Sequence, residues 1–132
     1  RRQVYRELII RAEPVVASGR IVILDATFSQ ADQRQLAIAL AGKYDAPLLI
    51  VETRCCAERV VERLGERHSQ GVDPSDAGPA FYEESARQFL PVDMQDHGTH
   101  IIVDTGTESW QADLRERVKS WQRNTGGDKS SR

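Results

Sequence analysis

Three short runs of consecutive apolar residues constrain the fold of this chain more than any other feature of its sequence. They are Ile21–Leu24, Leu48–Val51, and the run Ile101–Val103 that follows His100. A strand with one solvated face alternates apolar and polar residues. An unbroken apolar run is instead typical of a strand covered on both faces, as in a parallel α/β sheet. The three runs therefore predict three buried strands.

Segments with helical spacing separate these runs. The predicted helices are residues 2–18, 30–43, 57–68 and 80–89, and a last helix carrying the apolar stripe Leu114, Val118 and Trp121. Helix and strand thus alternate along the chain, an order that favours a parallel sheet with helices on both faces. The predicted fold class is α/β.

The first two helices carry signals for the core and for their ends. In helix 2–18 the residues expected to face the core are Val4, Leu8, Ala12, Val15 and Val16. Pro14 is expected to kink or weaken its last turn, and Gly19 stands where a C-terminal glycine belongs. For helix 30–43 we expect Ser29 as the N-terminal cap. The residues expected to face inward in this helix are Leu36, Leu40 and Ala41.

Length and charge bound the possible functions. The chain has 132 residues, enough for one modest domain, and a formal net charge of −2. That charge argues against a chain-wide nucleic-acid footprint, so any basic site must be local. No apolar run approaches the roughly 20 residues that a membrane span needs. The chain opens with neither an apolar region behind its first arginines nor an initiator Met, so we expect no signal peptide and a piece of a longer protein.

The two cysteines, Cys55 and Cys56, are adjacent. Adjacent residues suit the geometry of a disulfide poorly. Two thiols without a ladder of spacings indicate a reducing compartment, and so a cytoplasmic location. A vicinal redox or metal pair is the alternative, but no further cysteine or suitably spaced histidine completes such a site.

An acidic residue follows each apolar run. Asp25, Glu52 and Asp104 would project beyond the carboxyl ends of the predicted strands, where ligands bind in open parallel sheets. The carboxylate of Asp25 suits Mg²⁺ coordination or acceptance of a hydroxyl proton. The alternative is that Asp25 only ends a strand and caps a turn.

A row of arginines marks the third predicted helix. Arg59, Arg63 and Arg67 recur every four residues, beside a parallel row of glutamates. Such a row fits an external polyphosphate, because guanidinium groups bind phosphate oxygens in a fork. The alternative is a solvated face held by Arg–Glu pairs, and spacing alone favours that alternative.

Several segments, in this order and at these intervals, carry a family resemblance. They are Val4–Leu8, Val22–Arg34, Leu49–Arg54, Val60–Arg67, Asp73–Ala77 and Ile101–Gly106. Together they resemble the C-terminal portion of the AAA-type P-loop kinases, a group that includes polynucleotide 5′-kinases, zeta-toxin-like and gluconate-kinase-like enzymes. The resemblance spans about residues 3–122. It implies a three-layer P-loop NTPase-like sheet, with residues 1–123 in the kinase domain, a lid at about 66–79 and a disordered tail over 124–132.

The resemblance also implies roles for single residues. Asp25 is similar to the family's catalytic strand-end acid, which lies near Mg²⁺ and contacts it indirectly. The positions similar to ATP-binding residues are Arg59, Arg63, Arg67 and Thr105, of which Arg67 is also catalytic. Thr27 and Arg34 match substrate-side positions. The implied cofactors are ATP and Mg²⁺, and the implied reaction is phosphoryl transfer from ATP to a hydroxyl of a small molecule or nucleic-acid end.

The sequence departs from the family in one respect. The Gly-x-x-x-x-Gly-Lys-Ser/Thr loop and the family's first two strands have no counterpart among these residues. We therefore expect this chain to be inactive alone and to need the missing N-terminal segment, which belongs beside the Ile21–Leu24 strand. Some relatives are fused to an aminoglycoside-phosphotransferase-like domain, a further possible partner. The alternatives to a kinase are a receiver-like regulatory domain, or a degenerate P-loop relative that serves as a non-catalytic binding or dimerisation module.

Overall fold

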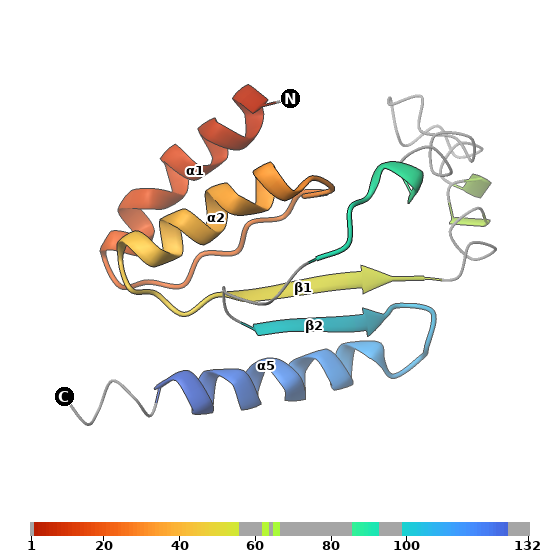
Figure 1. Cartoon of the computed structure of the whole chain (residues 1–132). Coiled ribbons are helices and arrows are strands. Elements are labelled where there is room, and N and C mark those ends of the chain that lie inside the picture. Colours follow the sequence, from red (N-terminus) through yellow and green to blue (C-terminus); the bar gives the residue numbers. More distant parts are fainter. Residues whose placement is uncertain (1, 56–61, 64, 67–85, 93–98, 127–132) are drawn as a thin grey trace. The chain divides into compact units, whose positions relative to one another are not determined.

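The structure is a computed structural model that describes residues 2–55, 62, 63, 65, 66, 86–92 and 99–126 (Figure 1). The chain divides into two compact units. The first comprises residues 1–48 and 88–99, and the second comprises residues 49–87 and 100–132. Each unit is described by itself. The predicted lid at about 66–79 falls outside the described residues except for residue 66, as do most of the predicted helices 57–68 and 80–89.

The first unit begins with helix α1, Arg2–Ala17, as predicted. The helix continues through Pro14, whose carbonyl still accepts a hydrogen bond from the Ser18 N–H at 3.2 Å. Gly19 then adopts a left-handed φ of +81°. Its N–H donates to the carbonyl of Val16 and the next N–H, of Arg20, donates to the carbonyl of Val15. This double closure is a Schellman motif, which confirms the predicted role of Gly19.

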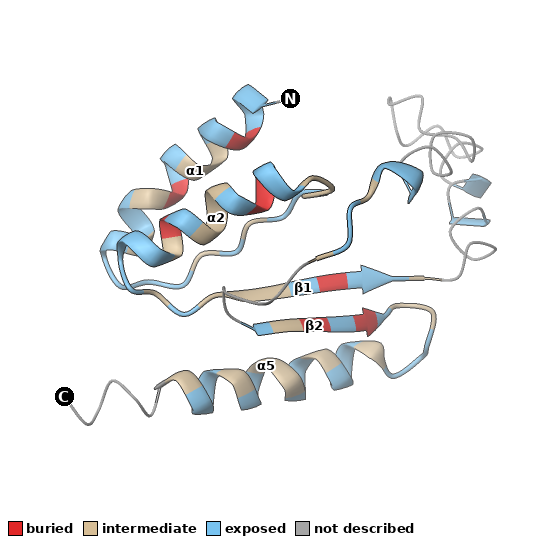
Figure 2. Cartoon of the chain, viewed as in Figure 1, coloured by how far each residue is buried: buried red, intermediate tan, exposed pale blue. Residues whose placement is uncertain are grey.

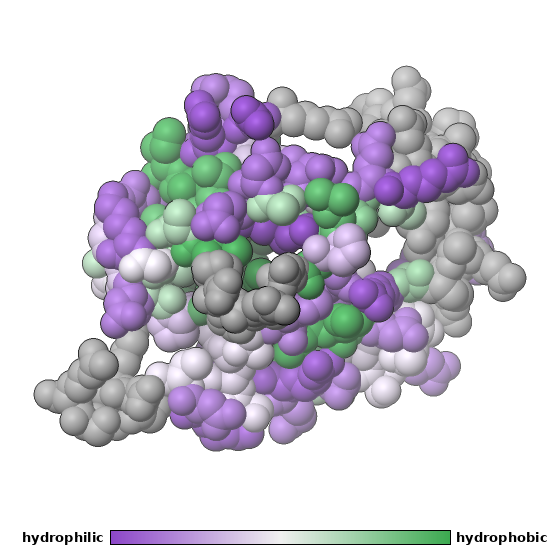
Figure 3. Space-filling model, in the orientation of Figure 1, coloured by the Kyte–Doolittle hydropathy of each residue, from purple (hydrophilic) through white to green (hydrophobic). Residues whose placement is uncertain are grey.

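The buried face of α1 differs from the predicted stripe. Tyr5 and Ala12 are buried, with Leu8 and Val16 half-buried, whereas Val4 is 67% exposed. The inward stripe is therefore rotated by one position at its N-terminal end. The reason is that the Tyr5 ring buries more area than the Val4 side chain can. The Tyr5 hydroxyl also finds hydrogen-bond partners there. Figure 3 shows hydrophobic side chains left at the surface beside hydrophilic ones around α1 and the helix that follows it.

The prediction of a buried strand at Ile21–Leu24 is wrong for this structure. The segment belongs to no strand, and Ile21 and Ile23 are 73% and 87% exposed. Figure 2 colours most of the stretch between α1 and α2 as exposed. An apolar run forms a strand only when a neighbouring strand pairs with its backbone. No such neighbour for residues 21–24 exists in the described part of the chain.

Helix α2, Ala31–Lys43, confirms the second predicted helix, but its cap is Gln30 rather than Ser29. The Gln33 side chain accepts a hydrogen bond from the Gln30 N–H at 3.1 Å, which satisfies one of the unpaired donors at this helix end. Ser29 instead uses its carbonyl, which accepts a hydrogen bond from the Leu90 N–H at 2.8 Å. Leu40 is buried as expected.

A polar clamp joins α1 to the end of α2, and the two helices pack side by side (Figure 1). Lys43 forms an ion pair with Glu13, and the Tyr44 hydroxyl donates to Glu13 Oε1 at 2.8 Å. The hydrogen bond from Lys43, and then that from Tyr44, lowers the pKa of Glu13 below its ordinary 4.5. The same hydrogen bonds raise the pKa of Lys43 above 10.5 and the pKa of Tyr44 above 10.0. At neutral pH these shifts favour the ionised carboxylate of Glu13, the protonated ammonium group of Lys43 and the neutral hydroxyl of Tyr44.

Strands β1, Leu49–Arg54, and β2, Thr99–Asp104, form a two-stranded sheet and confirm two of the three predicted strands. At one end the Thr99 N–H donates to the Leu48 carbonyl, and at the other the Thr105 N–H donates to the Arg54 carbonyl. The difference in residue number between donor and acceptor is the same for both hydrogen bonds, so the strands are parallel as predicted. Val103 is only 1% exposed. The full three-layer sheet stays a prediction.

Helix α5, Trp110–Gly126, follows β2 and runs back along it (Figure 1). Arg117 Nη1 donates to the Ile102 carbonyl at 2.6 Å, which ties the helix to the strand. The predicted stripe of Leu114, Val118 and Trp121 is half-buried. The helix ends at Gly126, three residues beyond the predicted domain boundary at 123. Within the part of the chain that the structure describes, none of the helices combines the length and the apolar character that a membrane span requires.

Candidate functional site

The carboxyl ends of β1 and β2 meet in the second unit. Arg54, the last residue of β1, accepts two hydrogen bonds on its carbonyl, from the Thr105 N–H at 2.8 Å and from Thr105 Oγ1 at 3.3 Å. Asp104 ends β2 and turns its carboxylate back onto the Gly106 N–H at 2.8 Å. The two strand ends are therefore joined into one short edge, and the backbone after β2 is fixed by several hydrogen bonds.

Arg63 reaches this edge from the helical residues between the two strands. Its Nη2 donates to the Thr105 carbonyl at 3.1 Å. The guanidinium group carries five N–H donors, of which this bond uses one. Arg63 and Thr105, both predicted to bind ATP, are thus brought together, whereas Arg59 and Arg67 lie outside the described residues.

Glu52 does not project beyond the strand end as expected. It lies inside β1, and its side chain is 8% exposed. Arg54 Nε donates to Glu52 Oε2 at 2.5 Å, while His100 Nε2 lies 3.8 Å from Oε1. A buried carboxylate requires partners, and Arg54 supplies one. The expectation failed because β1 extends three residues past the predicted strand, which places Glu52 within the sheet.

The other predicted site residues lie in the first unit. Asp25 is exposed and has no hydrogen-bond or ion-pair partner among the described residues. Two residues later, Thr27 Oγ1 lies 2.9 Å from the Tyr5 hydroxyl. The Tyr5 hydroxyl also accepts the Phe28 N–H at 3.2 Å, and the two rings meet edge to face at 5.1 Å. The loop after Asp25 is thus held from α1.

Arg34 was predicted as a substrate-side residue, and the structure places it in the interior of the first unit. It is 7% exposed. Its Nη1 donates to the Phe28 carbonyl at 2.6 Å, and its Nη2 donates to the Pro91 carbonyl at 3.1 Å. The guanidinium carbon also lies 5.5 Å from the centre of the Phe89 ring. These contacts join the backbone of Phe28 and Pro91 and the ring of Phe89 within the same unit.

Tyr5 was missed by sequence reasoning as a residue that shapes the site. The available signal was the tendency of a buried tyrosine to find a partner for its hydroxyl. That tendency does not identify the partner, because the contact to Thr27 spans 22 residues of sequence.

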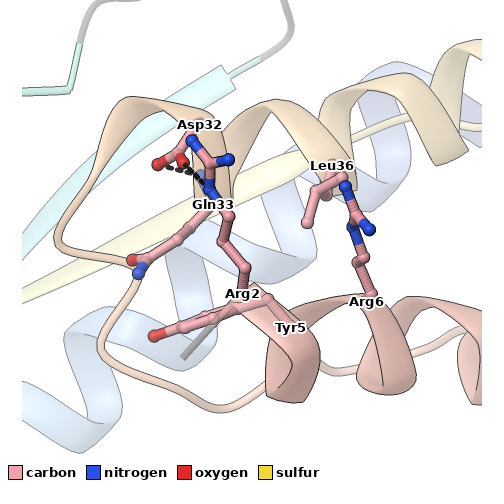
Figure 4. Close-up of a pocket in the computed structure, with 6 residues that line it drawn as sticks. All are labelled: Arg2, Tyr5, Arg6, Asp32, Gln33 and Leu36. Atoms are coloured by element: carbon pink, nitrogen blue, oxygen red, sulfur yellow. Dashed lines mark hydrogen bonds and ion pairs between the residues drawn. The ribbon is translucent and has the colours of Figure 1, made fainter.

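A cavity of about 150 Å³ lies between α1 and α2 (Figure 4). Its lining residues are Arg2, Tyr5, Arg6, Asp32, Gln33 and Leu36. Arg2 Nε lies 3.5 Å from Asp32 Oδ2, and Asp32 Oδ1 accepts the Gln33 N–H at 2.9 Å. The carboxylate is therefore already engaged, and no residue predicted to bind substrate lines this cavity.

No cluster of three or more histidine, cysteine, aspartate or glutamate side chains that could hold a metal exists within the described residues. Cys55 is a free, half-buried thiol there. Among the predicted residues, Asp25 offers a single accessible carboxylate. One carboxylate suits Mg²⁺, which keeps several waters and takes further ligands from substrate phosphates.

Comparison with known proteins places the chain in a family. A family model described as an AAA domain matches residues 1–92 of the 132. No curated protein and no solved structure matches the chain. The matched residues include Asp25, Thr27, Arg34 and Arg63, but not β2 or α5. The family is P-loop NTPase-like, and its membership indicates a nucleotide-binding, kinase-like module. Since the match covers more than half of its length, the chain belongs to the AAA domain family.

Proposed function

We propose that the chain supplies part of the active site of an ATP-dependent kinase, which transfers the γ-phosphoryl group of ATP to a hydroxyl of a small molecule or nucleic-acid end. The contact between Arg63 and Thr105 carries the proposal, because it puts a guanidinium group at the carboxyl ends of two parallel strands. Ligands of open α/β sheets bind beyond these ends. The family match supports a nucleotide as that ligand.

Arg63 is assigned to the phosphates of ATP, together with Arg67 and, as a weaker candidate, Arg59. Phosphoryl transfer depends on positioning and on neutralising charge on the phosphate oxygens, which guanidinium forks do well. Thr105 would lie near the adenine end of the nucleotide and hold Arg63 in place through its carbonyl. When bound, Mg²⁺ neutralises charge on the phosphates, and Asp25 would hold it through a water molecule.

Asp25 is also assigned to the acceptor. Its exposed carboxylate, free of partners among the described residues, is available to take the proton from the acceptor hydroxyl. Thr27 is assigned to the substrate side, two residues further along the same loop. The acceptor itself stays unassigned.

A phosphate-binding loop is needed to complete this site. The motif Gly-x-x-x-x-Gly-Lys-Ser/Thr does not occur in the 132 residues. We infer that the loop comes from a segment outside them and that these residues alone are inactive. A cytoplasmic location and a fused aminoglycoside-phosphotransferase-like domain stay predictions. The absence of the motif also favours a second candidate, a degenerate P-loop module that binds or regulates without catalysis.

Turnover of ATP by the full-length protein tests the proposal. Asp25→Asn keeps the shape of the side chain and removes the base, so the release of phosphate or its transfer to an acceptor should fall by about 100-fold. Asp45→Asn is the matched control, because Asp45 is an exposed residue whose φ of +50° suits asparagine equally well. If the full-length protein neither binds nor turns over Mg·ATP, the kinase assignment fails and the non-catalytic module takes its place.

A further inference from the structure

The loop that follows Asp25 contains a strained residue. Phe28 has a φ of +43°, in the left-handed region that residues other than glycine seldom adopt. Such a conformation persists only where the surrounding structure holds it, and it is concentrated at sites whose geometry must be preset.

Phe28 is held at its N–H, its carbonyl and its ring. The Tyr5 hydroxyl accepts its N–H at 3.2 Å, and the Tyr5 ring meets its ring edge to face. Arg34 Nη1 donates to its carbonyl at 2.6 Å. Tyr5 and Arg34 are both buried, and the two hydrogen bonds are part-buried, so both contacts are partly shielded from competing water. The backbone three residues after Asp25 is thus fixed from two sides.

The same arginine binds a second, distant segment. Its Nη2 donates to the Pro91 carbonyl at 3.1 Å and its guanidinium group lies against the Phe89 ring. Two further hydrogen bonds join these segments, from the Leu90 N–H to the Ser29 carbonyl and from Gln30 Nε2 to the Gln88 carbonyl. Arg34 therefore connects residues 28–30 with residues 88–91.

We propose that Arg34 is a positioning residue that clamps residues 88–91 to the loop Thr27–Gln30 and so presets the backbone next to Asp25, rather than a ligand of the substrate. A planar guanidinium group can bond two carbonyls and lie against an aromatic ring at once, which a lysine ammonium group cannot do. This inference rests on the proposed function only for its link to catalysis, because the clamp itself is a feature of the described residues.

Amide hydrogen exchange in the full-length protein tests the clamp without reference to activity. In Arg34→Met the amides of Phe28 and Leu90 should exchange at least about tenfold faster than in the unchanged protein, which corresponds to about 1.4 kcal/mol. The Thr105 amide, which bonds Arg54, should be unaffected. Arg20→Met is the matched control, since Arg20 is exposed and its side chain has no partner in the described residues. Arg34→Lys should give an intermediate rate, because it restores the charge but not the fork.

Kinetics of the same variants test the positioning role. With Mg·ATP as the probe, Arg34→Lys should lower kcat by about tenfold and leave the KM for ATP within about twofold, since the residues assigned to ATP are not in the clamp. Unchanged exchange at Phe28 and Leu90 in Arg34→Met would overturn the proposal, and so would an equal acceleration at every amide. If no variant turns over ATP, the kinase assignment fails while the exchange result still decides the clamp.

Discussion

The guanidinium group of Arg63 donates a hydrogen bond to the carbonyl of Thr105, 42 residues later in the chain, at 3.1 Å. Arg63 belongs to the predicted arginine row, and Thr105 follows the carboxyl end of β2. Their contact brings a phosphate-binding type of side chain to the edge of the sheet where nucleotides bind in such folds.

Tyr5→Phe should destabilise the protein, because it leaves the part-buried Phe28 N–H without its acceptor and Thr27 Oγ1 without its partner. The expected loss in the free energy of unfolding is about 1 kcal/mol or more, measured by denaturant titration. Tyr44→Phe is the matched control. Its hydroxyl bond lies at an exposed position, so its loss should be smaller. Equal losses for the two variants would contradict the role given to Tyr5.

Glu13→Gln should lower the thermal midpoint at neutral pH and lose its effect in acid. The pKa of Glu13 is lowered in the folded protein, so its stabilisation is present above its ordinary 4.5 and is lost as the pH falls through the folded value. The pKa of Lys43 is raised, so its contribution is present below its ordinary 10.5 and is lost as the pH rises through the folded value. Thermal melts of both proteins from acidic to alkaline pH measure where this stabilisation is lost. If the difference in thermal midpoint between Glu13→Gln and the unchanged protein is constant with pH, the polar clamp of Glu13, Lys43 and Tyr44 is refuted.

Substitution of Gly42 and of Gly19 by alanine should change the free energy of unfolding in opposite directions. Gly42 lies within α2 with no atom near enough to clash with an added Cβ, so Gly42→Ala should stabilise by about 0.5–1 kcal/mol. Gly19 has a φ of +81°, so Gly19→Ala should destabilise by about 1–2 kcal/mol although the space around it is also open. Denaturant titration of the two variants gives the signs. A stabilising Gly19→Ala would show that the Schellman ending of α1 is not formed.

Ile23→Thr tests whether a further segment of the full-length protein covers the apolar run at 21–24. If such a segment completes the sheet there, the substitution buries a hydroxyl and should cost about 1–3 kcal/mol of unfolding free energy. Val4→Thr, at a position that is 67% exposed on α1, is the control and should cost less than about 0.5 kcal/mol. A cost as small as that of the control would mean that Ile23 stays exposed, as in the structure of these residues.

Much of the local structure could be predicted from the sequence, because local signals decide it. The spacing of apolar residues predicted α1 and α2, a glycine predicted the end of α1, and unbroken apolar runs predicted β1 and β2. The strand at 21–24 failed because strand formation is not local. Its apolar run is as strong as that of β1, but it has no neighbour to pair with in the described part of the chain.

The site was less predictable for the same reason. The family resemblance pointed to Arg63 and Thr105, whereas the spacing of the arginine row alone favoured a solvated face, and their hydrogen bond could not be foreseen. The family resemblance assigned Arg34 to the substrate side, and a resemblance in sequence does not show the burial or the partners of a side chain. Its bond to Pro91 spans 57 residues, and no pattern in the sequence relates the two.

Titration of the full-length protein with ATP, in the presence and absence of Mg²⁺, decides whether Arg63 binds the nucleotide. We expect the unchanged protein to bind ATP, Arg63→Ala to bind it at least about tenfold more weakly, equivalent to about 1.4 kcal/mol, and the control Arg123→Ala on α5 to bind it as the unchanged protein does. Equal ATP affinity in all three proteins, or no ATP binding by the unchanged one, would contradict this expectation.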